Sequence, residues 1–173
     1  NGSIMEKITR NYLEINSLNE LSEVKKPNSN LILEKISSND FQLNKFFYKQ
    51  IGKNHNWTDR LSWTDKNWIK YVSNANLFTY VLKNKEEVVG YFEIIYHSEK
   101  FEAEIAYFGI LEEYLGKRIG GYMLSQAIKK SFEKNTKRAW VHTCSFDHKN
   151  ALNNYLARGM KIYNSEIVNI KSA

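Results

Sequence analysis

The sequence has little cysteine and little proline: one of each, Cys144 and Pro27, among 173 residues. A single cysteine excludes an internal disulfide, so a reducing, cytoplasmic location is expected. One proline and eight glycines argue against long disordered linkers. The chain has no apolar run long enough to cross a bilayer and no signal-peptide pattern, and we therefore expect no membrane partner.

Metal-ligand spacing is also missing. Four histidines are scattered along the chain with a single cysteine, so no metal is expected. His142 stands two residues before Cys144 and points the same way from a strand, which raises the alternative of a cysteine nucleophile. Cysteine–histidine dyads usually join distant segments, and a packing role for Cys144 is therefore favoured.

The composition supplies material for one sizeable core, because 42% of the residues are hydrophobic and 14% are aromatic. No internal repeat is present, and residues 1–173 are expected to form a single domain. Residues 1–4, which precede Met5, are interpreted as a remnant of an expression tag. The net charge is +6, but the basic residues are dispersed along the chain, so nucleic acid is not the expected partner.

Hydrophobic periodicity predicts strands and helices along most of the chain. Helix starts are indicated by a polar capping cluster at 38–40 and by Thr64, and a helix end by Gly159. The C-terminal half contains strand–helix–strand units with a long connection, which implies a right-handed parallel crossover. The predicted strands are 9–15, 31–36, 78–82, 88–96, 101–110, 139–144 and 160–168, and the predicted helices end near 50, 74, 132 and 158.

The segment 105–124 is the most informative part of the chain. An apolar strand leads into a basic, glycine-bearing turn that opens directly into a helix. Backbone N–H groups at a helix start, together with the helix dipole, attract phosphate, and a plain turn with solvated cations is the alternative. The residues expected to hold the phosphate are Gly116, Lys117, Arg118, Ile119, Gly120, Gly121 and Tyr122.

Two common phosphate motifs do not fit this turn. The Walker loop needs Ser or Thr after Gly-Lys, where this chain has Arg118, and the fingerprint G-x-G-x-x-G is absent. The turn resembles the acetyl-CoA pyrophosphate loop of the GNAT superfamily of N-acyltransferases, Q/R-x-x-G-x-G/A, laid over 115–120. Leu115 and Arg118 depart from that pattern, and the charge of Arg118 is expected to compensate for the missing glycine.

A second stretch carries the same resemblance. GNAT proteins often show N-x-x-A-x-x-x-Y-x-x-x-G-F here, and Ala151, Tyr155 and Gly159 match, with His148 and Met160 at the outer positions. The resemblance implies that Tyr155 protonates the departing CoA thiolate. A half-buried aromatic on an amphipathic helix is the alternative.

Acetyl transfer to an amine also needs a base, because an alkylamine with a pKa of about 10.4 is protonated near neutral pH. Alternation along the strand 101–110 predicts one face that contains Glu102, Glu104, Ala106 and Phe108. The histone-acetylating branch of the family has its catalytic glutamate eleven positions before the loop, and Glu104 has that spacing. Glu93, on the preceding strand, is the second candidate, with a solvent-facing position as its alternative.

The loop 52–63 is the candidate acceptor site. A subset of bacterial GNAT proteins has a similar W-T-D-R stretch with E-I-A-Y-F-G and W-x-H-T-C strands, which here are residues 57–60, 104–109 and 140–144. In the alternative, the tryptophans fill the core and the charges of the loop are locally satisfied. The residues expected to bind the acceptor are His55, Trp57, Asp59, Arg60 and His142.

The resemblance implies an α/β (α+β) fold with a central mixed, mostly antiparallel sheet of six to seven strands and about four flanking helices. It implies acetyl-CoA as cosubstrate, with its pantetheine arm added as a strand along Phe108, Gly109 and Ile110. It also implies direct transfer to a small-molecule or peptide amine by a monomer or homodimer. An inactive acyl-CoA sensor, a basic nucleic-acid-binding domain and another nucleotide-binding α/β enzyme are the alternatives.

Overall fold

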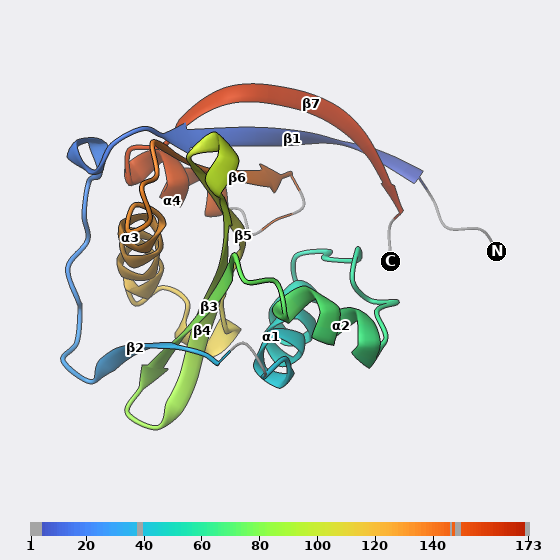
Figure 1. Cartoon of the computed structure of the whole chain (residues 1–173), viewed down its shortest axis with the longest axis horizontal. Helices are drawn as coiled ribbons and strands as arrows, with labels where there is room; N and C mark the ends of the chain where they lie inside the picture. The colour runs from blue at the N-terminus through green and yellow to red at the C-terminus, as the bar shows by residue number, and fades with distance from the viewer. Residues whose placement is uncertain (1–4, 38–39, 146, 148–149, 172–173) are drawn as a thin grey trace.

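The computed structural model describes residues 5–37, 40–145, 147 and 150–171. They form a seven-stranded sheet of order β2-β3-β4-β5-β6-β1-β7 (Figure 1). Neighbouring strands are antiparallel except β5 and β6, which confirms the predicted mixed sheet and its parallel crossover. The strands are β1 (Met5–Ile15), β2 (Leu31–Lys35), β3 (Leu77–Asn84), β4 (Glu87–His97), β5 (Glu102–Ile110), β6 (Arg138–Cys144) and β7 (Lys161–Lys171).

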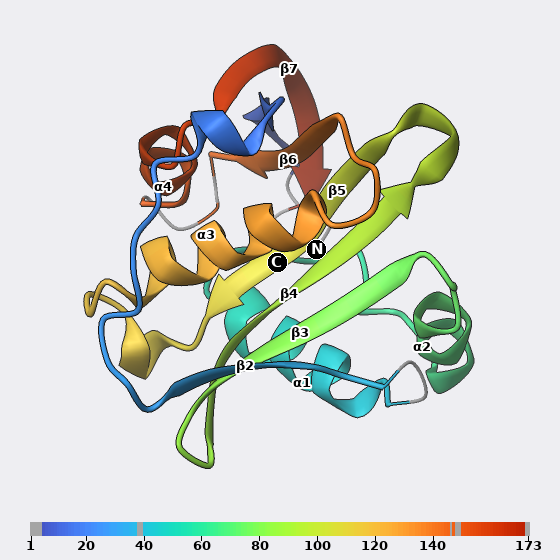
Figure 2. The ribbon, with the colours of Figure 1, turned by 60° about the vertical axis from the view of Figure 1, so that its left-hand side comes forward.

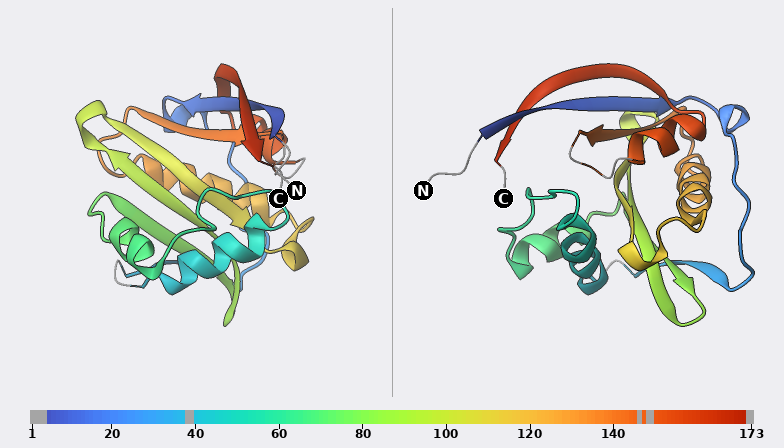
Figure 3. Two further views of the ribbon diagram at one scale, coloured as in Figure 1. Left: turned by 90° about the vertical axis from the view of Figure 1, so that its right-hand side faces the viewer. Right: turned by 180° about the vertical axis from the view of Figure 1, so that it is seen from behind.

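Helices cover both faces of the sheet. Helices α1 and α2 lie on one face, and α3 and α4 lie on the other (Figure 1, Figure 3). Figure 2 shows α3 lying across the middle strands, with α1 behind them. The α-helices are α1 (Gln42–Gly52), α2 (Asp65–Val72), α3 (Ile119–Ser131) and α4 (Ala151–Ala157). Among the residues described, no helix has both the length and the apolar character needed to cross a membrane.

The starts of α1 and α2 differ: α2 has a side-chain cap, whereas the N-cap residue of α1, Phe41, has none and the residue before it binds the helix start. Thr64 begins α2 as predicted, in a reciprocal capping box with Asn67. At α1, the Oδ1 atom of Asp40 accepts a hydrogen bond from the backbone N–H of Gln42 at 3.1 Å. Residues 38–39, the other members of the predicted capping cluster, lie outside the described residues.

Two apolar clusters hold the layers together. The larger one lies between the sheet and α3 and includes Ile105 and Met123. The smaller one lies under α1 and includes Phe47 and Tyr91, whose rings stack at a centroid distance of 4.9 Å. The sheet is therefore buried on both faces in its β3–β5 part, and the position of α1 is set by aromatic packing.

A β-bulge in β5 changes which side chains face the functional side. The β4–β5 register shifts between Glu93 and Ile94, and Ala106 is the extra residue. Glu104 points toward the side of α1, whereas Phe108 packs against the cluster under α3. The prediction that Glu104 and Phe108 share one face is wrong, because the extra residue reverses the alternation beyond it.

The strands β5 and β6 separate after a short contact. They pair only along 102–104 and 138–140, although both strands continue. On the far side of β6, β1 pairs with β6 only from Arg10 onward, and its first half pairs with β7 alone. The β1–β7 ribbon therefore projects past the sheet and arches over the side of α1 and α2 (Figure 1, Figure 3).

Candidate active site

A cavity of about 870 Å³ opens where β5 and β6 separate. This volume is in the range of ligand sites. Of the predicted site residues, Lys117, Ile119, Tyr122 and Glu93 do not line it; Ile119 and Tyr122 are buried in the core instead. The predicted residues that do line it are His55, Trp57, Asp59, Arg60, Glu104, Phe108, Gly109, Ile110, Gly116, Arg118, Gly120, Gly121, His142 and Tyr155.

One end of the cavity is the turn before α3. Gly116 has a φ of +78°, and a Cβ there would meet nothing within 4 Å, so the space above the turn is open. Arg118 is the N-cap residue of α3 and has a φ of 63°, the left-handed conformation that a glycine normally takes. None of the described side chains caps α3, so its first N–H groups are available to an anion.

Two residues of the α4 region lie at this turn, and sequence analysis missed both: Asn154 lines the cavity, whereas Arg158 lies beside Gly121 and does not line it. The Nδ2 atom of Asn154 donates to the carbonyl of Gly120 at 3.1 Å. The Nε atom of Arg158 is buried and has no hydrogen-bond partner within the described part of the chain. Burial and the nearby charge of Arg118 lower the pKa of Arg158, as expected where two cations converge.

Tyr155 lines the cavity. It is buried in α4, and its ring lies edge-on to Phe108 at a centroid distance of 6.3 Å. Burial, with a smaller contribution from Asp147, raises the pKa of Tyr155, so its hydroxyl stays protonated. His148, which stands at the outer asparagine position of the resembled pattern, lies outside the described residues.

The two candidate glutamates have different surroundings. Glu104 lines the cavity, its side chain is 19% exposed, and its Oε1 atom lies 3.0 Å from Nε2 of His97. Glu93 is fully buried and does not line the cavity. Its Oε2 atom accepts from Asn44 at 2.8 Å, and its Oε1 atom accepts from Tyr71 at 2.6 Å.

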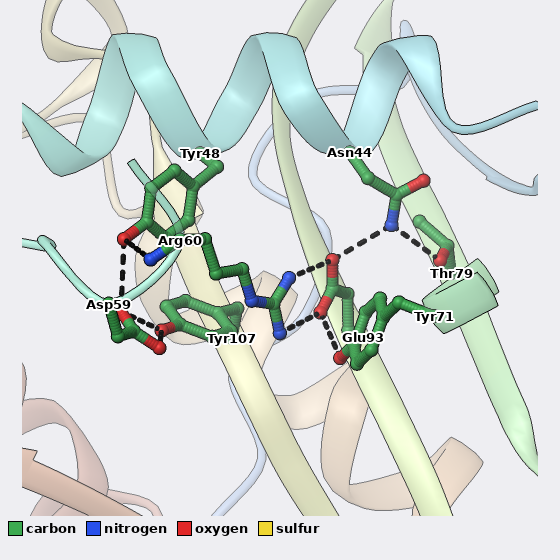
Figure 4. Close-up of polar contacts among 8 residues, drawn as sticks. All are labelled: Asn44, Tyr48, Asp59, Arg60, Tyr71, Thr79, Glu93 and Tyr107. Atoms are coloured by element: carbon green, nitrogen blue, oxygen red, sulfur yellow. Dashed lines mark hydrogen bonds and ion pairs between the residues drawn. The ribbon is translucent and has the colours of Figure 1, made fainter. Parts of the chain in front are cut away.

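Glu93 also holds Arg60, which comes from the loop between α1 and α2 (Figure 4). The guanidinium donates to both carboxylate oxygens, at 3.2 and 3.4 Å, and lies over the rings of Tyr71 and Tyr107 at 4.1 and 4.2 Å. Burial lowers the pKa of Arg60, but the carboxylate outweighs it, so the pKa is raised. Arg60 is thus a charged, largely buried member of the fold that has one side in the cavity.

Asp59 is satisfied within the same network. It accepts hydrogen bonds from the hydroxyl of Tyr48 at 2.9 Å and from the hydroxyl of Tyr107 at 2.7 and 2.6 Å. Burial raises the pKa of both tyrosines, and the carboxylate raises it further. The charges of Asp59 and Arg60 therefore have partners inside the protein, as in the alternative of a packed loop.

Asp147, another residue missed by sequence analysis, ties this loop to the end of β6. Its Oδ1 atom accepts from the indole N–H of Trp57 at 3.0 Å and lies 3.8 Å from Nδ1 of His55. Its Oδ2 atom accepts from the Thr143 hydroxyl at 2.7 Å. A carboxylate in the turn directly after a strand was the available signal. The loop is thereby connected across the cavity to β6.

The far wall of the cavity is formed by β6 and β1. His142 of β6 is exposed to the cavity, and Arg10 of β1 lines it as well. Burial in this concave wall and the nearby charge of Arg10 lower the pKa of His142, so its imidazole is neutral near pH 7. Nothing in the spacing of the sequence singled out Arg10. Within the described residues, no three His, Cys, Asp or Glu side chains are grouped to hold a metal ion.

Solved structures share this fold at low sequence identity. A GCN5-related N-acetyltransferase from Kribbella flavida is 15% identical with a TM-score of 0.66; the match covers 96% of this chain and 59% of that one. An aminoglycoside acetyltransferase from an uncultured soil metagenomic sample, in complex with trehalose, is 16% identical with a TM-score of 0.67, over 86% of this chain and 99% of that one. PaiA N-acetyltransferase from Thermoplasma acidophilum, in complex with coenzyme A, is 15% identical with a TM-score of 0.64; the match covers 82% of this chain and 99% of that one.

The chain thus spans 59% of the length of the Kribbella flavida protein. No curated protein sequence matches it. Residues 39–160 match the acetyltransferase (GNAT) family. Because that match takes in the separated strands, the glycine turn and most of the cavity wall, the chain belongs to the acetyltransferase (GNAT) family.

Proposed function

We propose that this protein is an N-acetyltransferase that moves an acetyl group from acetyl-CoA to a primary amine by direct transfer in a ternary complex. The observation that carries the proposal is one continuous cavity with a phosphate-suited helix start at one end and the carboxylate of Glu104 at the other. The buried hydroxyl of Tyr155 lies on the wall between them.

The coenzyme end is assigned to the diphosphate of acetyl-CoA. The turn 116–121 supplies backbone N–H groups, and Arg118 and Arg158 supply charge. The pantetheine arm lies along residues 108–110, where β5 has lost β6 as a neighbour and can pair with an added strand. Gly109 keeps this stretch close to α1, because a Cβ there would collide with Ile51 at 2.7 Å.

The chemical step uses Glu104 and Tyr155. Glu104 takes a proton from the ammonium group, directly or through water, and the amine nitrogen attacks the thioester carbonyl carbon. The bulge at Ala106 leaves backbone groups outside the β4 ladder, and their N–H groups stabilise the oxyanion. The C–S bond then breaks, Tyr155 donates its proton to the thiolate, and the nitrogen releases its remaining extra proton, which returns the Tyr155 phenolate to the phenol through solvent. Glu93, whose oxygens are already engaged, positions Arg60 and its loop.

The test is thiol release from acetyl-CoA with a panel of primary amines, together with thermal unfolding in the presence of ligands. Acetyl-CoA is expected to raise Tm, whereas ATP and NAD are not. Glu104→Gln is expected to lower kcat by about 100-fold or more. A Tm that ignores millimolar coenzyme A would overturn the assignment. Binding without thiol release for every amine would favour the inactive sensor instead.

A further inference from the structure

Arg10 is a cation of the cavity wall that the mechanism does not use. It extends from β1 and lines the cavity, and its Nε atom is buried without a hydrogen-bond partner among the residues described. Within the described part of the chain, its nearest carboxylate is that of Glu166, whose Oε1 atom lies 3.6 Å from Nη1 of Arg10. That distance is too long for a good hydrogen bond, and the same oxygen already accepts from the Tyr12 hydroxyl at 2.7 Å.

The other charged groups of this half of the cavity are better satisfied. Arg60 forms two hydrogen bonds to Glu93, Asp59 accepts from two tyrosine hydroxyls, and Glu104 contacts His97. The Arg10 side chain is 32% exposed and lines the cavity, so its guanidinium remains accessible to an anion there. Arg10 is therefore the group in this wall that is best prepared for a ligand from outside the protein.

The strand register places Arg10 next to the reaction centre. Arg10 is directly opposite Cys144 in the β1–β6 pair, so their Cα atoms are about 5 Å apart and their side chains share a face. His142 lies two residues back along β6 on that same face. Because β6 leaves β5 after Trp140, Arg10 and His142 form the wall that faces Glu104 across the opening.

We propose that Arg10 and His142 form a carboxylate-binding subsite, and that the acceptor is a primary amine that carries a carboxylate, such as a free amino acid. The inference rests on the proposed acetyl transfer and names its substrate class. A guanidinium binds a carboxylate through two parallel hydrogen bonds, and a neutral imidazole adds a third donor without a competing charge. The amine of the same molecule then points toward Glu104. A polycation would instead be repelled by Arg10.

The test compares matched acceptors at saturating acetyl-CoA. The twenty standard amino acids and their primary amides are assayed for thiol release, and the ratio of kcat/KM for acid over amide is measured for each pair. The expected ratio for the preferred amino acid is about 10 to 100, since a charge-assisted pair is lost in the amide. Arg10→Gln is expected to bring that ratio close to one, and Arg10→Lys to restore part of it.

Glu166→Gln is the matched control, because it removes the negative charge beside Arg10 and leaves the guanidinium in place. It is expected to keep the wild-type ratio. Equal loss in Arg10→Gln and Glu166→Gln would show that Arg10 acts only through that ion pair, and would overturn the proposal. Equal rates with acids and amides, or a preference for spermidine, would overturn it while acetyl transfer itself stood.

A carboxylate could also reach Arg10 on the acyl group. Succinyl-CoA is therefore assayed beside acetyl-CoA with the same amides. A preference for succinyl-CoA that is lost in Arg10→Gln would assign the subsite to the donor and contradict the proposal for the acceptor. Thiol release from no donor with any amine would instead contradict the proposed function itself.

Discussion

The two ends of the cavity are built in opposite ways. At the α1–α2 loop, Arg60 and Asp59 have hydrogen-bond partners inside the protein. At the start of α3, Arg118 has a left-handed backbone, and Arg158, which lies beside Gly121 outside the cavity lining, has a buried Nε without a partner in the described chain. Satisfied charges hold a loop in place, whereas strain and unpaired donors mark a place prepared for a ligand.

The same contrast explains why charge in the cavity is a poor guide to function by itself. Arg60 and Arg10 both line the cavity, but Arg60 has a carboxylate at 3.2 Å, whereas Arg10 has none closer than 3.6 Å among the residues that the structure describes. Removing a charged group that has its partners inside the protein, as Arg60 does, is expected to affect stability. Removing a group without a close partner, such as Arg10, is expected to affect ligand binding or turnover. Four predictions test that division.

The largest expected effect is a loss of stability when the Arg60–Glu93 pair is broken. Glu93→Ala is expected to lower the free energy of unfolding by about 3–5 kcal/mol, because it leaves a buried guanidinium without its counter-charge. Urea unfolding measures it. The double variant Arg60→Met/Glu93→Met is the control, and it is expected to be more stable than Glu93→Ala. A loss below 1 kcal/mol would show that the loop does not depend on this pair.

The next largest expected effect is a loss of turnover when the hydroxyl of Tyr155 is removed. Tyr155→Phe is expected to lower kcat by about 100-fold, or about 2.7 kcal/mol, because the thiolate loses its proton donor. The Kd of acetyl-CoA is expected to change little, since the phenyl ring keeps its packing on Phe108. Stopped-flow thiol detection and calorimetry measure the two quantities. An unchanged kcat would remove Tyr155 from the mechanism.

A smaller effect distinguishes two adjacent glycines in α3. A Cβ at Gly121 would collide with Nη1 of Arg158 and lie 2.9 Å from Cγ2 of Val24, whereas a Cβ at Gly120 has no neighbour closer than 3.6 Å. Gly121→Ala is expected to lose about 1 kcal/mol of stability and to weaken coenzyme A binding by displacing Arg158. Gly120→Ala is the matched control and is expected to unfold at the wild-type denaturant concentration or above it. Identical unfolding curves for the two variants would contradict the packing described.

The smallest expected effect is at Arg118, whose backbone has a left-handed conformation. Arg118→Gly is expected to raise the free energy of unfolding by up to about 1 kcal/mol, because glycine takes this conformation without strain. Its affinity for coenzyme A is expected to fall, and the fall is expected to shrink at high salt. Arg118→Ala loses the same charge but keeps the strain, so it is expected to weaken binding without gaining stability. Equal stability of the two variants would show that the strain at this position is negligible.

Much of the half of the cavity that we assign to coenzyme A was predictable, because it depends on local features. A glycine turn, a helix start and a tyrosine four residues after Ala151 are all close in sequence, and their spacing carries over to the structure. The half that we assign to the acceptor was less predictable. His55, Trp57 and His142 do line the cavity, but their partner Asp147 and the opposing Arg10 come from separate parts of the chain.

The amino-acid sequence alone determined the family, the order of strands and helices and the phosphate-suited turn, because periodicity, capping and glycine positions act over a few residues. Tertiary structure alone decided three things. Ala106 forms a bulge, Glu93 is paired with Arg60, and Arg10 has no close acceptor within the described part of the chain. The physical reason is that strand register and burial are set by contacts between distant segments. Those contacts decide whether a charged side chain is satisfied by the protein or remains available to a ligand.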